Sequence, residues 1–165
     1  TMGYGYGVSV SLIQLARAYT AFAGDGSIAP VTLSRDAQLL PRGQVMSPRT
    51  AQSIRDMLEL TVTHPHGTGK MAQIEGFRVG AKTGTARKQI GKTYAAGKYR
   101  AVFVGMAPMS APRLVVAVMV DEPSAKGYSG GVVAGPIFKN IMVESLRILG
   151  VVPDQGDKVS LHRFE

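Results

Sequence analysis

The chain has 165 residues, of which 45% are hydrophobic and 18% are charged, with a formal net charge of +8. This composition is typical of a folded domain or part of one, and it excludes a disordered or fibrous chain. The absence of cysteine excludes disulfides, thiolate metal ligands and cysteine nucleophiles. The longest unbroken apolar run, Leu114 to Val120, is too short to cross a bilayer.

The first half of the chain predicts two helices. Ser11-Leu12-Ile13-Gln14 is a capping-box pattern that begins the first, and Gly24-Asp25-Gly26 ends it. Residues 27–45 predict a short hairpin or extended segment. Ser47-Pro48 predicts the N-cap and first residue of the second helix. Its predicted apolar face consists of Ala51, Ile54, Met57, Leu58 and Val62.

The second half predicts a sheet and a third helix. We expect one strand from Phe77 through Ala86, and an antiparallel hairpin of Ala101 to Ala107 with Leu114 to Val120. A glycine-rich loop from Gly127 to Gly135 precedes a helix from Pro136 to Leu149, and the segment from Val151 to Glu165 is expected to fray. The predicted inner stripe of this helix is Ile137, Ile141, Met142, Ser145 and Ile148. The predicted class is α+β, an antiparallel sheet flanked by helices.

One block of the sequence is strongly basic, because no acidic residue occurs from Gly76 to Val120. Its cations are Arg78, Lys82, Arg87, Lys88, Lys92, Lys98, Arg100 and Arg113. Such a block fits a solvated surface, a nucleic-acid partner or a small anionic ligand. Its aromatic residues follow no pattern typical of single-stranded nucleic-acid binding, so we expect no nucleic acid and favour the small anion.

Three other motifs lack the context that their chemistry needs. His64 and His66 have no further ligand at a recognised spacing, so we expect no metal. Gly91-Lys92-Thr93 resembles a phosphate-binding loop, but a predicted strand follows where that loop requires a helix. A Ser-His-Asp triad has no supporting G-x-S-x-G sequence.

Lys82-Thr83-Gly84-Thr85 on a strand edge is suited to acyl transfer from an anionic peptide. The ammonium group supplies positive potential, and the two-residue period of a strand directs both threonine hydroxyls to one face. Gly84 allows the substrate backbone to approach, and an exposed strand edge can pair with it.

This motif resembles the Lys-Thr-Gly sequence of the penicillin-binding D,D-transpeptidases and serine β-lactamases. Further segments resemble class B penicillin-binding proteins, in particular the septal cell-division type of Gram-negative bacteria known as penicillin-binding protein 3. These segments are Gly3-Tyr4-Gly5, residues 11–19, Gly24-Asp25-Gly26, Gly67-Thr68-Gly69, residues 82–88, Asp121-Glu122-Pro123 and residues 128–136. The resemblance implies that residues 1–153 are the C-terminal part of a transpeptidase domain, followed by a polar tail at 154–165.

The resemblance also implies roles for particular residues. Lys82 would serve the proton-transfer network, Thr83 and Thr85 would bind the carboxylate of a substrate or β-lactam, and the Thr85 backbone N–H would stabilise the oxyanion. The implied catalytic residues are thus Lys82, Thr83 and Thr85, and the implied substrate-binding residues are Gly84, Ala86, Arg87, Tyr128 and Ser129. No cofactor is implied.

The family's Ser-x-x-Lys and Ser-x-Asn motifs, which carry the nucleophile and a proton shuttle, occur nowhere in the 165 residues. The chain alone is therefore expected to be inactive and to need the N-terminal part of the same transpeptidase. By resemblance, its other partners are peptidoglycan stem peptides, β-lactams and septal division proteins, on the periplasmic side of the inner membrane. A serine β-lactamase or D,D-carboxypeptidase, and a basic anion- or nucleic-acid-binding module, stay open as alternatives.

Overall fold

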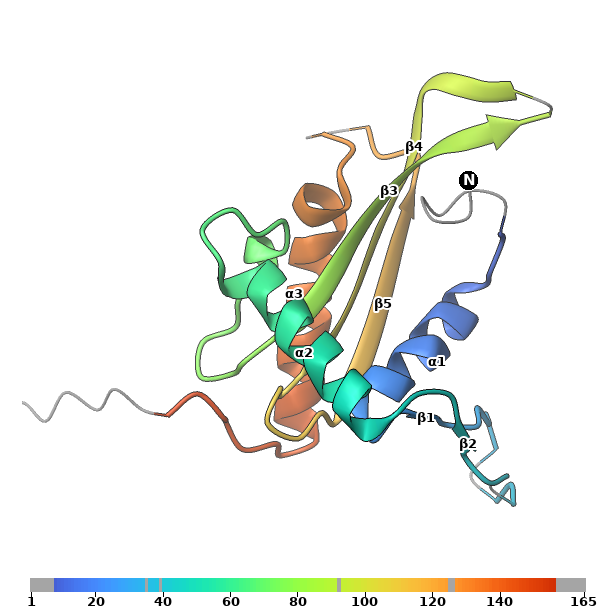
Figure 1. Ribbon diagram of the computed structural model, residues 1–165. Coiled ribbons are helices and arrows are strands. Elements are labelled where there is room, and N and C mark those ends of the chain that lie inside the picture. Colours follow the sequence, from blue (N-terminus) through green and yellow to red (C-terminus); the bar gives the residue numbers. More distant parts are fainter. Residues whose placement is uncertain (1–7, 35, 39, 92, 125–126, 157–165) are drawn as a thin grey trace, which may run out of the picture.

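The computed structural model describes residues 8–34, 36–38, 40–91, 93–124 and 127–156, which form a sheet covered by helices (Figure 1). The helices are α1 (Leu12–Ala23), α2 (Pro48–Thr63) and α3 (Gly130–Ile148), with a short 3₁₀ helix η2 (Lys70–Ala72). Strands β3 (Gly80–Ile90), β4 (Thr93–Ala107) and β5 (Leu114–Asp121) form an antiparallel sheet in that order, and β1 (Ser27–Ile28) pairs separately with β2 (Gly43–Gln44). The predicted α+β class is confirmed.

Local signals position the first two helices as expected. The Ser11 hydroxyl accepts a bond from the Gln14 N–H at 3.3 Å, while the Gln14 side chain accepts one from the Ser11 N–H at 2.8 Å. Ser47 caps α2 through the Thr50 N–H at 3.1 Å. The predicted apolar face of α2 is wrong at Met57, whose side chain is 57% exposed.

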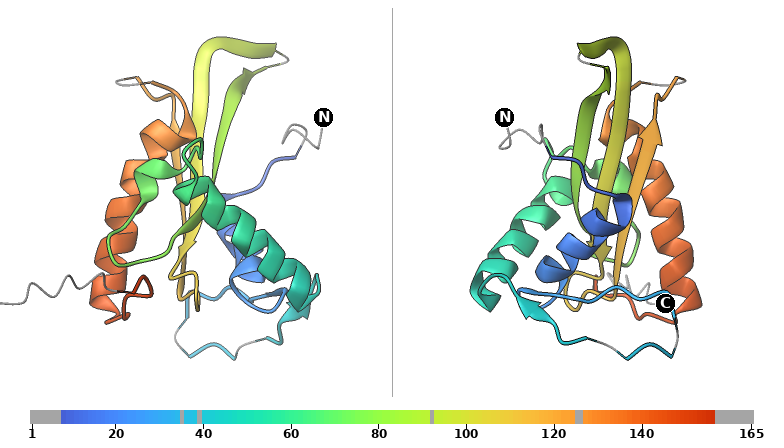
Figure 2. Two further views of the ribbon diagram at one scale, coloured as in Figure 1. Left: turned by 60° about the vertical axis from the view of Figure 1, so that its left-hand side comes forward. Right: turned by 90° about the vertical axis from the view of Figure 1, so that its right-hand side faces the viewer.

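Helices cover both faces of the sheet, with α3 on one face and α1 and α2 on the other (Figure 2). The end of β4 is buried on both sides because alternate side chains reach the two layers. Phe103 packs against Phe138 of α3, with ring centroids 4.9 Å apart, whereas Met106 packs with Leu58 of α2. The sheet is thereby fixed between two apolar layers, and β3 lies at its edge.

The first strand of the sheet begins and ends later than predicted. Phe77 forms only an isolated bridge to Ile74, around a turn in which Gly76 has a positive φ of 79°. The strand starts at Gly80 and continues to Ile90, and its partner β4 starts at Thr93 instead of Ala101. The sequence resembling a phosphate-binding loop therefore connects two long strands, with no helix after it; Lys92 itself lies outside the described residues.

Helix α3 begins at Gly130, so the predicted loop is wrong from Gly130 to Gly135, and Pro136 lies inside the helix. The predicted inner stripe is confirmed at Met142, which is buried, but it is wrong at Ile137 and Ile141, which are exposed, and at Ile148, which is 75% exposed. The buried residues are Gly130, Gly131, Ala134, Gly135, Phe138, Met142 and Leu146. Small residues at the start of this stripe let the helix approach the sheet closely.

The chain after α3 returns to the body of the molecule. The Asp154 carboxylate accepts hydrogen bonds from the backbone N–H groups of Arg78 at 2.7 Å and Ser110 at 2.9 Å. The Gln155 N–H donates to the Gly76 carbonyl at 3.0 Å. The expected fraying is thus wrong for residues 151–155, and the predicted tail from 157 onward lies outside the described residues.

Candidate active site

The Lys82-Thr83-Gly84-Thr85 motif lies on β3, which among the described residues pairs only with β4. This confirms the predicted position at a sheet edge. The N-terminal half of the strand is held from α2, where the Thr61 hydroxyl donates to the Ala81 carbonyl at 2.5 Å. The outer edge of the strand beyond this point offers backbone groups for pairing with an extended peptide.

Thr83 and Thr85 direct their hydroxyls to the α3 side of the sheet. The hydroxyls of Thr83 and Thr68 are 3.0 Å apart, and the Thr85 hydroxyl accepts a hydrogen bond from the Gly130 N–H at 3.0 Å. Because a hydroxyl can donate and accept at once, Thr85 retains its proton for a bond to an anion. The structure therefore combines support from α3 with a hydroxyl donor at the strand edge.

Two glycines bring the beginning of α3 against the motif. A Cβ atom at Gly130 would overlap the carbonyl oxygens of Gly84 and Val102, and one at Gly131 would overlap the carbonyl oxygen of Thr68. These close approaches allow the bond between the Gly130 N–H and Thr85. Sequence reasoning assigned no site role to Thr68, Gly130 or Gly131, although all three occur in the segments that carry the family resemblance.

Gly130→Ala is expected to destabilise the complete domain, meaning this chain together with the N-terminal part that the resemblance implies, by about 1–3 kcal/mol. The reason is that the new methyl group meets backbone atoms that cannot rotate away. The matched control is Gly43→Ala, since a Cβ at Gly43 has no atom within 4 Å. Urea unfolding of both variants measures the difference. Equal stabilities would show that α3 does not need this close approach.

Lys82 lies on the opposite face of β3 from the threonine hydroxyls, as strand alternation requires. Its side chain is exposed, and its ammonium group donates to the Thr83 carbonyl at 2.8 Å. No carboxylate pairs with it in the described part of the chain. Its positive charge therefore remains available to a group that approaches this face.

The remaining predicted substrate residues lie further along β3 and before α3. Arg87 is exposed and pairs in the ladder with Tyr99, whose ring stacks on Tyr128 with centroids 4.3 Å apart. Ala86 lies half-buried between Thr85 and Arg87, and Ser129 is the N-cap of α3 without a side-chain capping bond. The structure thus brings Arg87 and Tyr128 to one region through Tyr99, which sequence reasoning did not assign to the site.

Four of the seven described cations of the basic block form ion pairs, which they share among three carboxylates from outside it. Arg78 binds Glu59 at 2.6 Å, and Lys88, Lys98 and Arg100 bind Asp121 or Glu122. In the described part of the chain, the cations of the block without a carboxylate partner are Lys82, Arg87 and Arg113. Two of these three, Lys82 of the motif and Arg87 just after it, lie on β3, which localises positive potential there.

The ion pairs of Lys88 shift the pKa values of Lys88, Asp121 and Glu122. Hydrogen bonds from Lys88 hold the pKa of Asp121 and of Glu122 below the ordinary values, and the same bonds raise the pKa of Lys88. Because the two carboxyl groups have lower pKa values in the folded protein, their ionised forms stabilise the fold at pH values above the ordinary carboxyl pKa of about 4. This stabilisation is lost as the pH falls through the lowered values. The protonated Lys88 side chain also stabilises the fold, and because its pKa is raised, this stabilisation is lost only as the pH rises through that raised value. Lys88, Asp121 and Glu122 are therefore charged at neutral pH.

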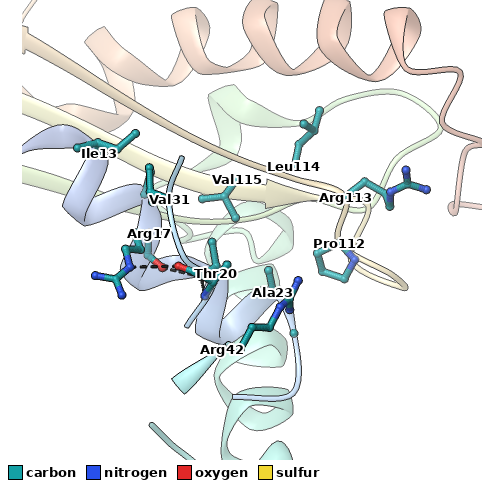
Figure 3. Close-up of a pocket in the computed structure, with 13 residues that line it drawn as sticks. Ile13, Arg17, Thr20, Ala23, Val31, Arg42, Pro112, Arg113, Leu114 and Val115 are labelled. Carbon is teal, nitrogen blue, oxygen red and sulfur yellow. Dashed lines mark hydrogen bonds between the residues drawn. The ribbon is translucent and has the colours of Figure 1, made fainter. Parts of the chain in front are cut away.

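A separate pocket of about 330 Å³ lies between α1, the loop after it and the start of β5 (Figure 3). Its walls include Ile13, Val31 and Val115, and the Arg17 guanidinium donates to the Ala29 carbonyl at 3.1 Å beside it. None of the predicted site residues lines this pocket. It offers an apolar surface bordered by arginines, without the hydroxyls and amine of the motif.

Neither a metal-binding group of side chains nor a membrane-spanning helix occurs in the described ranges. No group of three or more His, Asp or Glu side chains there could hold a metal ion. The rings of His64 and His66 are 5.6 Å apart, and the His66 N–H donates to Nδ1 of His64. Of the helices described, none has the length and apolar character needed to span a bilayer.

The edge strand, its Lys-Thr-Gly-Thr sequence and the helix that begins beside it are those of a penicillin-binding fold. The chain belongs to the penicillin binding protein transpeptidase domain family, whose model matches residues 1–143. It is 51% identical over 154 residues to the probable peptidoglycan D,D-transpeptidase PenA of Neisseria meningitidis serogroup A, and 35% identical over 161 residues to the peptidoglycan D,D-transpeptidase FtsI of Escherichia coli K12. The resemblance inferred from the sequence motifs is confirmed.

A solved structure shares the fold at close similarity. The transpeptidase domain of Burkholderia pseudomallei penicillin-binding protein 3, in its apo form, superposes with a TM-score of 0.84 at 55% identity. The match covers 94% of this chain and 47% of that one. The two curated relatives are matched over 93% and 96% of this chain but only 26% and 27% of their own lengths. The chain thus spans about a quarter of those relatives.

Proposed function

We propose that this chain forms one wall of the active site of a serine D,D-transpeptidase that cross-links peptidoglycan stem peptides and is acylated by β-lactams. The observation that carries the proposal is the edge strand, which presents two anchored hydroxyls together with a lysine and an arginine that have no carboxylate partner among the described residues. The family relationship and the names of the relatives support it. The complete domain consists of this chain together with an upstream part that carries Ser-x-x-Lys and Ser-x-Asn.

In the proposed reaction, the upstream serine attacks the carbonyl carbon between the two terminal D-alanines and loses its proton to a base. The amide bond breaks, D-alanine leaves with a proton, and an amine from a neighbouring stem peptide then displaces the serine oxygen. The negative charge that develops on the carbonyl oxygen would be stabilised by the Thr85 backbone N–H. Lys82 would contribute its ammonium group to the proton-transfer network.

The substrate carboxylate would lie on the α3 side of β3. Thr83 and Thr85 would donate their hydroxyl protons to it, and Arg87 would supply a charge-assisted bond. Gly84 and Ala86, which present little side-chain bulk, would allow the peptide to pair with the strand edge. Tyr128, stacked on Tyr99, and Ser129 would border the space for the substrate side chain.

The cellular setting is part of the same proposal. The relation to a FtsI protein supports a septal role, with division proteins as partners and the domain on the periplasmic side of the inner membrane. Residues 1–153 would be the C-terminal part of the transpeptidase domain, with 154–165 as its tail, although Asp154 and Gln155 are tied to the body by hydrogen bonds.

Arg87→Ala in the complete domain is expected to lower the second-order rate constant for acylation by a carboxylate-bearing β-lactam about tenfold. The expected loss is that of one charge-assisted bond at a solvent-exposed position. The matched control is Arg147→Ala on α3, an exposed arginine that pairs with Glu144. Stopped-flow acylation distinguishes the outcomes: a parent domain that is not acylated contradicts the function, and a normal rate in the variant removes Arg87 from the site.

A further inference from the structure

Five charged side chains form one cluster where the three strands of the sheet run side by side. Lys88 of β3 contacts Asp121 at 2.6 Å and Glu122 at 2.7 Å, so it links the edge strand to the end of β5 across β4. Arg100 contacts Asp121 at 3.0 Å, and Lys98 contacts Glu122 at 3.1 Å. The Lys88 side chain, which contacts both carboxylates, is only 21% exposed.

The cluster lies where the pairing of β3 with β4 is irregular. The ladder is regular from Gly80 to Arg87, and its register then shifts between Arg87 and Gln89. Lys88 is the one residue of β3 in this irregular stretch, and it lies opposite the four extra residues of β4, Ala95 to Lys98. Because a bulge interrupts the ladder hydrogen bonds, the strand at Arg87 needs another constraint to keep its position. The two carboxylates supply that constraint through the side chain of Lys88.

The same cluster also constrains the residue opposite Arg87. The Glu122 backbone N–H donates to the Tyr99 carbonyl at 2.9 Å, and Glu122 has a positive φ of 51°, which is uncommon for a residue other than glycine. Such a conformation persists only where the surroundings determine it, and it is typical of functional regions. Tyr99 in turn pairs with Arg87 and stacks on Tyr128.

We propose that Lys88 is a positioning residue for the carboxylate-binding end of the site. Bound to Asp121 and Glu122, it fixes the bulge so that Arg87 and the stacked Tyr99 and Tyr128 face a bound ligand together. Lys88 does not touch the ligand, since its ammonium group is occupied by two carboxylates. The proposal rests on the proposed function, because it assigns Lys88 to the binding of the carboxylate in that reaction.

The test compares Lys88→Met with Lys98→Met in the complete domain. Both variants remove one positive charge from the same hairpin, so they change the long-range field on an anion alike. Among the described carboxylates, however, Lys98 pairs with Glu122 alone. Lys88→Met is expected to raise the apparent dissociation constant of a carboxylate-bearing β-lactam five- to tenfold with the acylation rate constant unchanged. Lys98→Met is expected to change it less than twofold, and Lys88→Arg to restore the parental value.

A double-mutant cycle with Arg87→Ala decides whether Lys88 acts through Arg87. If it does, Lys88→Met has little further effect once Arg87 is absent; full additivity would overturn the proposal. Hydrogen exchange of the backbone amides at 86–90 provides a readout without ligand, and faster exchange in Lys88→Met than in Lys98→Met is expected. A parent domain that is not acylated would contradict the proposed function, whereas unchanged exchange in Lys88→Met would contradict the positioning role by itself.

Discussion

Thr85→Val in the complete domain is expected to be acylated by a carboxylate-bearing β-lactam about 30 to 100 times more slowly than the parent, as for loss of a hydrogen bond to a charged group. The Thr85 hydroxyl has one function in the structure and a second in the proposed site. It accepts a hydrogen bond from the Gly130 N–H at 3.0 Å, and its proton remains available to the ligand carboxylate. Valine retains the branched shape and the backbone N–H but loses both hydroxyl functions.

The same substitution is expected to lower stability by about 1–3 kcal/mol, because the Gly130 N–H loses its acceptor in a half-buried position. Acylation is therefore measured well below the melting temperature of the variant. Thr85→Ser, which retains the hydroxyl, is expected to recover most of the rate. Thr93→Val, at the exposed start of β4, controls for the exchange of threonine for valine in the hairpin. Parental acylation by a folded Thr85→Val domain would mean that the hydroxyl does not bind the ligand.

Sequence reasoning located the helices that have local boundary signals. Ser11 with Gln14, and Ser47 with Pro48, satisfy free backbone groups within a few residues of the helix start, so these helices begin as predicted. At the start of α3, the side chain of the N-cap residue Ser129 makes no such bond. Gly130 and Gly131 are typical of a loop by propensity, yet they are helical because only glycine permits the close contact with β3 and Thr68.

The charge pattern of the sequence was also incomplete without the strand register. The acid-free block suggested a continuous positive surface, but Asp121 and Glu122, immediately after it, lie beside Lys88, Lys98 and Arg100 once the strands pair. The stack of Tyr99 on Tyr128 depends equally on the position of the segment before α3. Strand alternation alone was enough to predict that Thr83 and Thr85 share a face.

The most direct test of the central claim is to treat the complete domain with a fluorescent penicillin and map the adduct by proteolysis and mass spectrometry. We expect one adduct per domain, on the serine of the upstream Ser-x-x-Lys motif, with no modified residue between Thr1 and Glu165. Lys82→Ala is expected to reduce the rate of labelling while leaving the adduct on the same serine. A folded domain without any adduct, or an adduct on a residue of this chain, would contradict the assignment of the chain as one wall of a serine transpeptidase site.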